Sequence, residues 1–182
     1  MTNILSSDDS TLVIGDEHVS TGQKLNRADL LGKAIKDIKP TRIVHIGDLM
    51  TFDVFSAWDR DKRKKMEGRR YQKEIDAGLE YLDRIDKASG GYKCEVIMTE
   101  GNHEDRLWRY IDHNPEMEGA IDYVRDLNIS HWNIIPYKGY YNYKGVGFTH
   151  IPINGAGKPI GGKYVCTKAL ELHQGSTVFG HT

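Results

Sequence analysis

The chain alternates short apolar runs with longer stretches of helical periodicity, and this alternation is what most restricts its fold. Three runs have the length and composition of buried strands: Thr11–Ile14, Arg42–Ile46 and Glu95–Met98. Between them, apolar residues recur at helical spacing over 28–38, where Pro40 ends the pattern, and over 71–85. Such an alternation predicts βαβ units and a largely parallel sheet, an α/β fold.

The second half of the chain has the shorter strands and tight turns of a more antiparallel arrangement. The predicted strands there are Asn133–Pro136, Tyr140–Tyr143, Val146–His150 and Thr177–Phe179. Lys144-Gly145 is a predicted hairpin turn, Ile153–Gly162 a mobile Gly/Pro-rich loop and Tyr164–Gln174 a helix. We expect a flexible start over residues 1–10 and a single domain over 11–182.

Composition excludes several classes of protein. The net charge is −1, so no overall field attracts the chain to nucleic acid or a membrane. The 2 cysteines, Cys94 and Cys166, form no Cys-x-x-Cys pattern, which is typical of a reducing compartment. No apolar run approaches the ~20 residues that cross a bilayer. We therefore expect a cytoplasmic protein with no membrane partner.

Polar clusters follow the predicted strands at the point where each strand ends. They are Asp16-Glu17-His18, Gly47-Asp48, Gly101-Asn102-His103-Glu104, His150 and Gly180-His181-Thr182. Ligands collect at the carboxyl ends of strands in open α/β sheets. Carboxylate oxygens and imidazole nitrogens bind zinc, manganese or iron. In an extended strand end, Asp16 and His18 would point the same way, and the glycines let the backbone turn tightly.

The order D-x-H, GD, GNH[DE], H and GH resembles the calcineurin-like metallophosphoesterase superfamily, and the resemblance runs from Asp16 to Thr182. The segments GDLMTFDVFSAWD and KMEGRRY are similar to those of phage-encoded members, for which the location would be the host cytoplasm. The resemblance implies an α/β/β/α sandwich, two facing sheets flanked by helices. It also implies two divalent metal ions, with manganese favoured and zinc or iron as alternatives.

The resemblance also implies a role for each residue of these motifs. Asp16 and His18 would bind the first metal, and Asp48 would bridge both. The second metal would be completed by Asn102, His150 and His181. His103 would lie beside the metals without binding them, contacting the phosphate or protonating the leaving oxygen as general acid. A hydroxide between the metals would attack phosphorus.

The sequence departs from the family pattern at its end. The pattern is Gly-His-x-His, and the chain stops at Thr182, one residue before the last histidine. Two interpretations are open: a truncated product, or a natural end at which another ligand takes the place of the last histidine. We favour truncation, with C-terminal strands missing. We therefore expect weak occupancy of the first metal site.

The basic stretch Arg60–Lys73 leaves two interpretations open: a solvated helix face, or a surface for a phosphate-rich substrate. Trp58, Trp108 and Tyr110 would stack on bases or pack in the core. We favour hydrolysis of phosphodiester, nucleotide or nucleic-acid substrates. The alternatives are a phosphomonoesterase, and a scaffold of low activity that binds a partner protein.

Other polar residues have ordinary explanations. His45 is expected to be buried with its hydrogen bonds satisfied, and Glu17 to face solvent or support a ligand. Arg106 would reach either a substrate phosphate or a nearby carboxylate. The histidines expected on the surface are His113, His131 and His173. The carboxylates expected at helix starts are Asp53 and Asp105.

Overall fold

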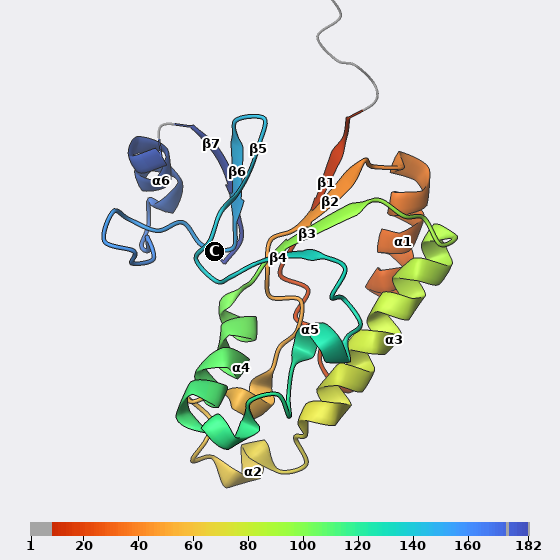
Figure 1. The fold of residues 1–182 in the computed structure, drawn as a ribbon, viewed down its shortest axis with the longest axis vertical. Coiled ribbons are helices and arrows are strands. Elements are labelled where there is room, and N and C mark those ends of the chain that lie inside the picture. The colour runs from red at the N-terminus through yellow and green to blue at the C-terminus, as the bar shows by residue number, and fades with distance from the viewer. Residues whose placement is uncertain (1–8, 174, 182) are drawn as a thin grey trace, which may run out of the picture.

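The computed structural model describes residues 9–173 and 175–181, and these form two sheets with helices outside them (Figure 1). The first sheet has the order β1-β2-β3-β4 and is parallel throughout. Its strands are β1 (Thr11–Ile14), β2 (Arg42–His45), β3 (Glu95–Thr99) and β4 (Asn133–Ile135). These match the predicted strands to within a residue at each end, and the parallel sheet is confirmed.

Two helices cover the outer face of this sheet, as predicted from their apolar periodicity. They are α1 (Asn26–Ile38) and α3 (Tyr71–Ser89), and they pack along one another (Figure 1). Gly32 permits the contact, because a Cβ atom there would lie 2.6 Å from the Cβ of Ala88. α1 ends at Lys39, directly before Pro40, and α3 ends at Gly90, both in the left-handed conformation common after helices.

The second sheet contains β5 (Tyr141–Tyr143), β6 (Val146–Thr149) and β7 (Ser176–Phe179). β5 and β6 are antiparallel and form the predicted hairpin, whereas β7 is parallel to β6 and follows α6 (Val165–His173). An apolar cluster joins the two sheets: Val44, Ile46 and Ile97 from the first and Phe148 from the second. The expectation of facing sheets flanked by helices is confirmed.

Several short elements and one long helix were not predicted. They are η1 (Asp53–Phe55), α2 (Arg63–Met66), α4 (Asn102–His113), η2 (Pro115–Met117) and α5 (Tyr123–Asp126). α4 buries Leu107 and also the charged Glu104, so its buried face lacks a plain apolar stripe. These elements and α3 enclose the larger apolar core, which extends below the carboxyl ends of the first sheet.

Some expectations fall on residues outside the described part, namely 1–8, Gln174 and Thr182. At the border of that part, Asp9 pairs with Arg42 and Lys144. The predicted loop 153–162 contains no helix or strand and only an isolated bridge between Ile153 and Pro159. Among the helices described, none has the length and apolar character to cross a membrane.

Candidate metal centre

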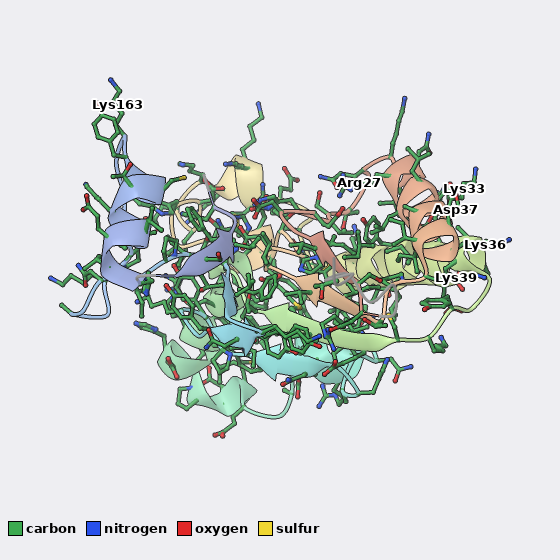
Figure 2. The ribbon with its side chains drawn as sticks, turned by 90° about the horizontal axis from the view of Figure 1, so that it is seen from above. Arg27, Lys33, Lys36, Asp37, Lys39 and Lys163 are labelled. Carbon is green, nitrogen blue, oxygen red and sulfur yellow. The ribbon has the colours of Figure 1, made fainter. Side chains whose placement is uncertain are left out.

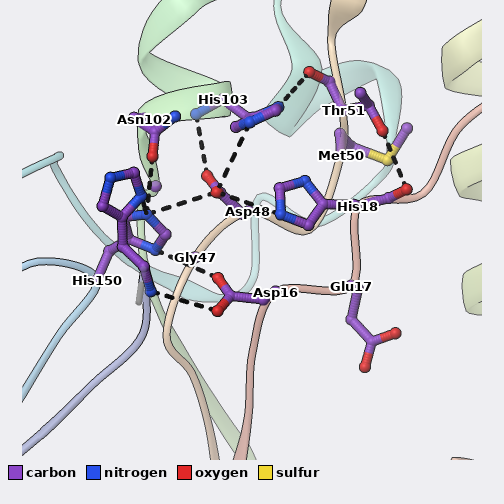
Figure 3. Close-up of polar contacts among 12 residues, drawn as sticks. Asp16, Glu17, His18, Gly47, Asp48, Met50, Thr51, Asn102, His103 and His150 are labelled. Carbon is purple, nitrogen blue, oxygen red and sulfur yellow. Dashed lines mark hydrogen bonds and ion pairs between the residues drawn. The ribbon is translucent and has the colours of Figure 1, made fainter.

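The polar residues predicted at the strand ends come together at one edge of the two sheets (Figure 3). Asp16 and His18 follow β1, Asp48 follows β2, and Asn102 and His103 begin α4 directly after β3. His150 and His181 arrive from the second sheet, after β6 and β7. The fold thus gathers all seven predicted site residues from five strand ends, although the role of each stays a prediction.

Four of these residues adopt the left-handed backbone conformation, which is uncommon for residues other than glycine. The φ angles are 53° at Asp16, 47° at His18, 53° at Asp48 and 56° at His181. Backbone strain of this kind concentrates at functional sites, where surrounding structure enforces it. The tight turns therefore aim these side chains at a common point at a cost in conformational energy.

The same angles correct one expectation. We expected the side chains of Asp16 and His18 to point the same way, as they would at an extended strand end. The backbone of neither residue is extended. Asp16 faces the second sheet, where its Oδ2 accepts the His181 N–H at 3.3 Å. His18 faces Asp48, with 3.6 Å between its Nε2 and the carboxylate Oδ2. The two side chains flank Asp48 from different directions (Figure 3).

Around His150, acceptor atoms converge. His150 is buried, and its Nδ1 donates to the carbonyl oxygen of Ile46 at 2.8 Å. Burial lowers the pKa of His150, so the ring is neutral and Nε2 carries a bare lone pair. The Nε2 atom lies 3.0 Å from Oδ1 of Asn102 and 3.2 Å from Nδ1 of His181. Such a set of electron-pair donors suits a cation, and Asp48 Oδ2 lies 3.5 Å away to share it.

On the other side of Asp48 lies the pair of His18 and His103. Their ring centroids are 4.5 Å apart, and one potential ligand atom from each lies within 4.8 Å of the Asp48 carboxylate and of the other. His103 Nδ1 donates to the Thr51 carbonyl at 2.6 Å, so Nε2 is the bare nitrogen. Arg106 Nη2 already lies 3.1 Å from that Nε2. Thr51 and Arg106 therefore hold the ring of His103, whereas its role stays a prediction, because its ligand atom is also close enough to those of His18 and Asp48 to share a metal ion.

Glu104 is a structural partner of the site that the sequence analysis did not single out. It is 0% exposed, and its Oε2 accepts the N–H groups of Asp48 and Gly101, each at 2.9 Å. Its Oε1 accepts the Met50 N–H at 3.0 Å. Burial, assisted by the charge of Asp48, raises the pKa of Glu104 to about 7, although these backbone N–H groups oppose the rise. Its side chain thus joins the turns that carry Asp48 and Asn102; the acidic position of the GNH[DE] motif was the available signal.

The glycines of the motifs are required by these turns. Gly47 has a φ of 90°, and a Cβ atom on it would lie 2.6 Å from the Gly101 nitrogen. A Cβ on Gly101 would in turn collide with the carboxylate of Asp48. The expected tight turn is confirmed at Gly47, and both glycines also let the two motif turns approach one another closely.

The residues given ordinary explanations mostly behave as expected. His113, His131 and His173 are exposed, and Asp53 and Asp105 lie in first turns of helices. Glu17 turns away from Asp48 (Figure 3) and accepts hydrogen bonds from Arg27 and Tyr81. His45 is buried, but the expectation that its hydrogen bonds are satisfied is wrong. Its Nδ1 accepts the Gly47 N–H, while its Nε2 has no partner among the described residues.

A cavity of about 280 Å³ adjoins the centre and is lined by Asn102 at one end. Trp58, Arg60, Arg106, Arg109 and Tyr110 also line it. Trp58 is 83% exposed, so the expectation that it packs in the core is wrong, whereas Trp108 and Tyr110 pack against the core. Arg106 does pair with a carboxylate, Asp53, at 3.2 Å.

The basic stretch 60–73 divides between its two interpretations. Lys62 and Lys65 pair with the buried Asp59 at 2.9 and 2.6 Å, so their charges hold the local fold together. Arg69 pairs with Asp53 at 3.4 Å. Arg60, by contrast, borders the cavity beside the centre. Arg60 is therefore the residue of the stretch that borders the candidate site, and for the exposed remainder both interpretations stay open.

Comparison with known proteins identifies one family. The sequence pattern of the calcineurin-like phosphoesterases matches residues 10–182. Among solved structures, TT1561 of Thermus thermophilus is similar at 10% identity over 93% of this chain and 56% of that chain, with a TM-score of 0.39. A second crystal structure is similar at 13% identity over 78% of this chain and 51% of that one, with a TM-score of 0.37. The chain spans about half the length of these structures, and no curated protein matches it.

Proposed function

Because the chain belongs to the calcineurin-like phosphoesterase family, we propose that it hydrolyses phosphodiesters of nucleotides or nucleic acids at a centre of two metal ions. One observation carries the choice of substrate. The cavity beside Asn102 combines exposed Trp58 with Arg60, Arg106 and Arg109, and so offers an aromatic face and positive charge next to the metal ligands. Aromatic rings and arginines are the groups that bind bases and phosphates of single strands.

The proposed ligands divide around Asp48. His150, His181 and Asn102 would hold one ion, and His18, with Asp16 at the rim, would hold the other. Manganese is the proposed ion, since oxygen and imidazole donors without thiolate suit it. Bound divalent ions would supply an activated water and neutralise charge on the phosphoryl oxygens.

The chain's own side chains would do the remaining work. His103 would take up a proton at its bare Nε2 once Arg106 has moved away and would pass that proton to the leaving oxygen, while Thr51 keeps the ring oriented through Nδ1. Arg106, 3.1 Å from that Nε2, would release it and bind a phosphate oxygen when substrate enters. The second ester substituent would lie in the cavity against Trp58.

The experiment compares bis-p-nitrophenyl phosphate, p-nitrophenyl phosphate and a short single-stranded oligonucleotide, with manganese added. We expect turnover of both diesters and weak turnover of the monoester. A preference for the monoester would favour a phosphomonoesterase. Inactivity toward all three, together with bound metal, would favour a scaffold that binds a partner protein.

Variants of the cavity test the observation directly. Trp58→Ala and Arg60→Ala should each raise KM for the oligonucleotide about tenfold, which is the range of one lost stacking or charged contact. They should leave p-nitrophenyl phosphate unaffected, since its single substituent does not need the cavity. Lys36→Ala is the matched control, because Lys36 is an exposed cation on α1 (Figure 2). An unchanged KM for the oligonucleotide in both cavity variants would contradict the proposed substrate.

A further inference from the structure

A second cavity, of about 480 Å³, lies between the first sheet and the helices α1 and α3. Ile14, Ile43 and Val96 of the strands form its floor, and Leu31, Leu79 and Leu82 of the helices form its roof. Charged residues, among them Asp86 and Lys93, line its rim. Its size is that of a site for a small molecule, and its walls are mainly aliphatic.

One polar atom breaks the apolar floor of this cavity. His45 is 4% exposed and lies on the same face of β2 as Ile43, so its ring belongs to the cavity wall. The Gly47 N–H lies 3.2 Å from Nδ1 of His45 and donates to it, which requires Nδ1 to be unprotonated. Burial lowers the pKa of His45 to about 4, so the ring is neutral and Nε2 bears the hydrogen. That N–H donor has no acceptor among the described residues.

A buried donor without an acceptor is rare in folded proteins and needs an explanation. A trapped water would need two to four polar partners. The neighbours of His45 on this face do not provide them: Ile14 is opposite in the register of β1 and β2, and Ile43 precedes it by two residues. Glu17 is also in the wall, and its Oε2 already accepts hydrogen bonds from Arg27 and Tyr81.

We propose that the cavity binds a small uncharged molecule with an apolar body and one hydrogen-bond acceptor, such as a carbonyl or ether oxygen, directed at the Nε2–H of His45. The apolar body matches the largely apolar walls, and the acceptor matches the buried Nε2–H of His45, which has no acceptor among the described residues. The site lies behind the metal centre rather than in it. His45 accepts a hydrogen bond from Gly47, the residue before Asp48. A molecule bound to His45 would therefore affect the turn that carries Asp48.

The test uses two probes of similar size, acetophenone, which has a carbonyl, and ethylbenzene, which does not. In nuclear magnetic resonance titrations of the full chain, acetophenone should shift the His45 ring nitrogen, the Gly47 amide and the Leu79 methyl groups. It should bind about tenfold more tightly than ethylbenzene, the gain expected of one net hydrogen bond. Equal affinity for the two probes, or no binding of either, would overturn the proposal.

Variants separate the cavity from unspecific binding. Leu79→Trp should fill the cavity and abolish binding of both probes, because Leu79 forms part of its roof and is 38% exposed. Leu30→Trp is the matched control: Leu30 is 66% exposed on α1 outside the cavity lining, and binding should persist. His45→Leu should remove the preference for acetophenone. If His45→Leu fails to fold, the comparison of the two probes and the two tryptophan variants still tests the proposal. Binding that is retained in Leu79→Trp would refute the site.

Discussion

Two groups of side chains share Asp48, and they differ in what their imidazole nitrogens already bind. In the group of His150, His181 and Asn102, the Nε2 of His150 lies 3.0 Å from Oδ1 of Asn102 and 3.2 Å from Nδ1 of His181. In the group of His18 and His103, the Nε2 of His103 is already met by Arg106. Nitrogen and oxygen ligand atoms that converge in this way suit a cation, whereas a nitrogen that already accepts from a guanidinium is free for proton transfer only after the guanidinium moves.

The two groups also rest on different supports. His150 is buried between the sheets and is oriented by the carbonyl of Ile46. His103 is oriented by Thr51, at the start of a segment that continues into η1 and whose Val54 N–H binds Glu74. The candidate ion site around His150 is therefore held by the strands of the two sheets. The proposed proton donor, His103, is held by irregular chain.

Asp48→Asn should have the largest effect, because both groups depend on this one carboxylate. An amide carries no charge to offset two cations, so we expect activity to vanish and both ions to be lost. Elemental analysis and hydrolysis of bis-p-nitrophenyl phosphate measure this. Asp37→Asn, at an exposed position of α1, is the control. Retention of two ions per chain would show that the groups do not share Asp48.

His103→Ala should lower turnover by about 10²- to 10⁴-fold, the usual contribution of a positioned general acid. Metal content should stay nearly intact, because His103 is proposed to act beside the ions, with its Nε2 3.1 Å from Arg106. His131→Ala, an exposed histidine that does not line the cavity beside the centre, should change neither quantity. Loss of an ion on His103→Ala would instead make His103 a ligand and erase the contrast between the two groups.

Glu104→Gln should lower the free energy of unfolding by about 1–3 kcal/mol, the cost of leaving a buried N–H unpaired. The amide has only one acceptor oxygen, so it cannot serve the N–H groups of Asp48, Met50 and Gly101 together. Urea unfolding measures the loss, and Glu116→Gln, which is exposed, is the control. An unchanged urea midpoint would mean that Glu104 does not hold the two motif turns together.

Glu74→Gln should have the smallest effect and should sharpen the comparison at the support of His103. Glu74 is 5% exposed, and burial raises its pKa to about 7. A raised pKa favours the folded state below the ordinary pKa of a glutamate, and this contribution is lost as pH rises through 7. Relative to Glu74→Gln, the natural chain should therefore lose stability between pH 5 and pH 8.

Thermal unfolding across that pH range measures the difference between the two chains, in which all other titrating groups cancel. Glu80→Gln, on the exposed side of the same helix, should show no such pH dependence. Parallel pH profiles for the natural chain and Glu74→Gln would place the Glu74 carboxyl in an ordinary aqueous environment.

Much of the fold could be predicted because its strands and long helices have regular patterns. β2 has an apolar centre, Ile43 and Val44, and α3 repeats apolar residues at helical spacing. α4 escaped prediction because Glu104 is on its buried face, where a hydrophobic residue is expected. The free nitrogen of His45 escaped as well, since a mid-strand histidine in an apolar run gives no sign of whether its ring finds an acceptor.

The sequence by itself determined which residues form the centre, because the strand periods place each motif at a carboxyl end and parallel strands bring those ends to one edge. Only the tertiary structure decided the direction of each side chain. Left-handed turns at Asp16, His18, Asp48 and His181 depend on contacts with other turns, such as the hydrogen bonds of Glu104. These contacts join residues far apart in the chain, so no local pattern records them.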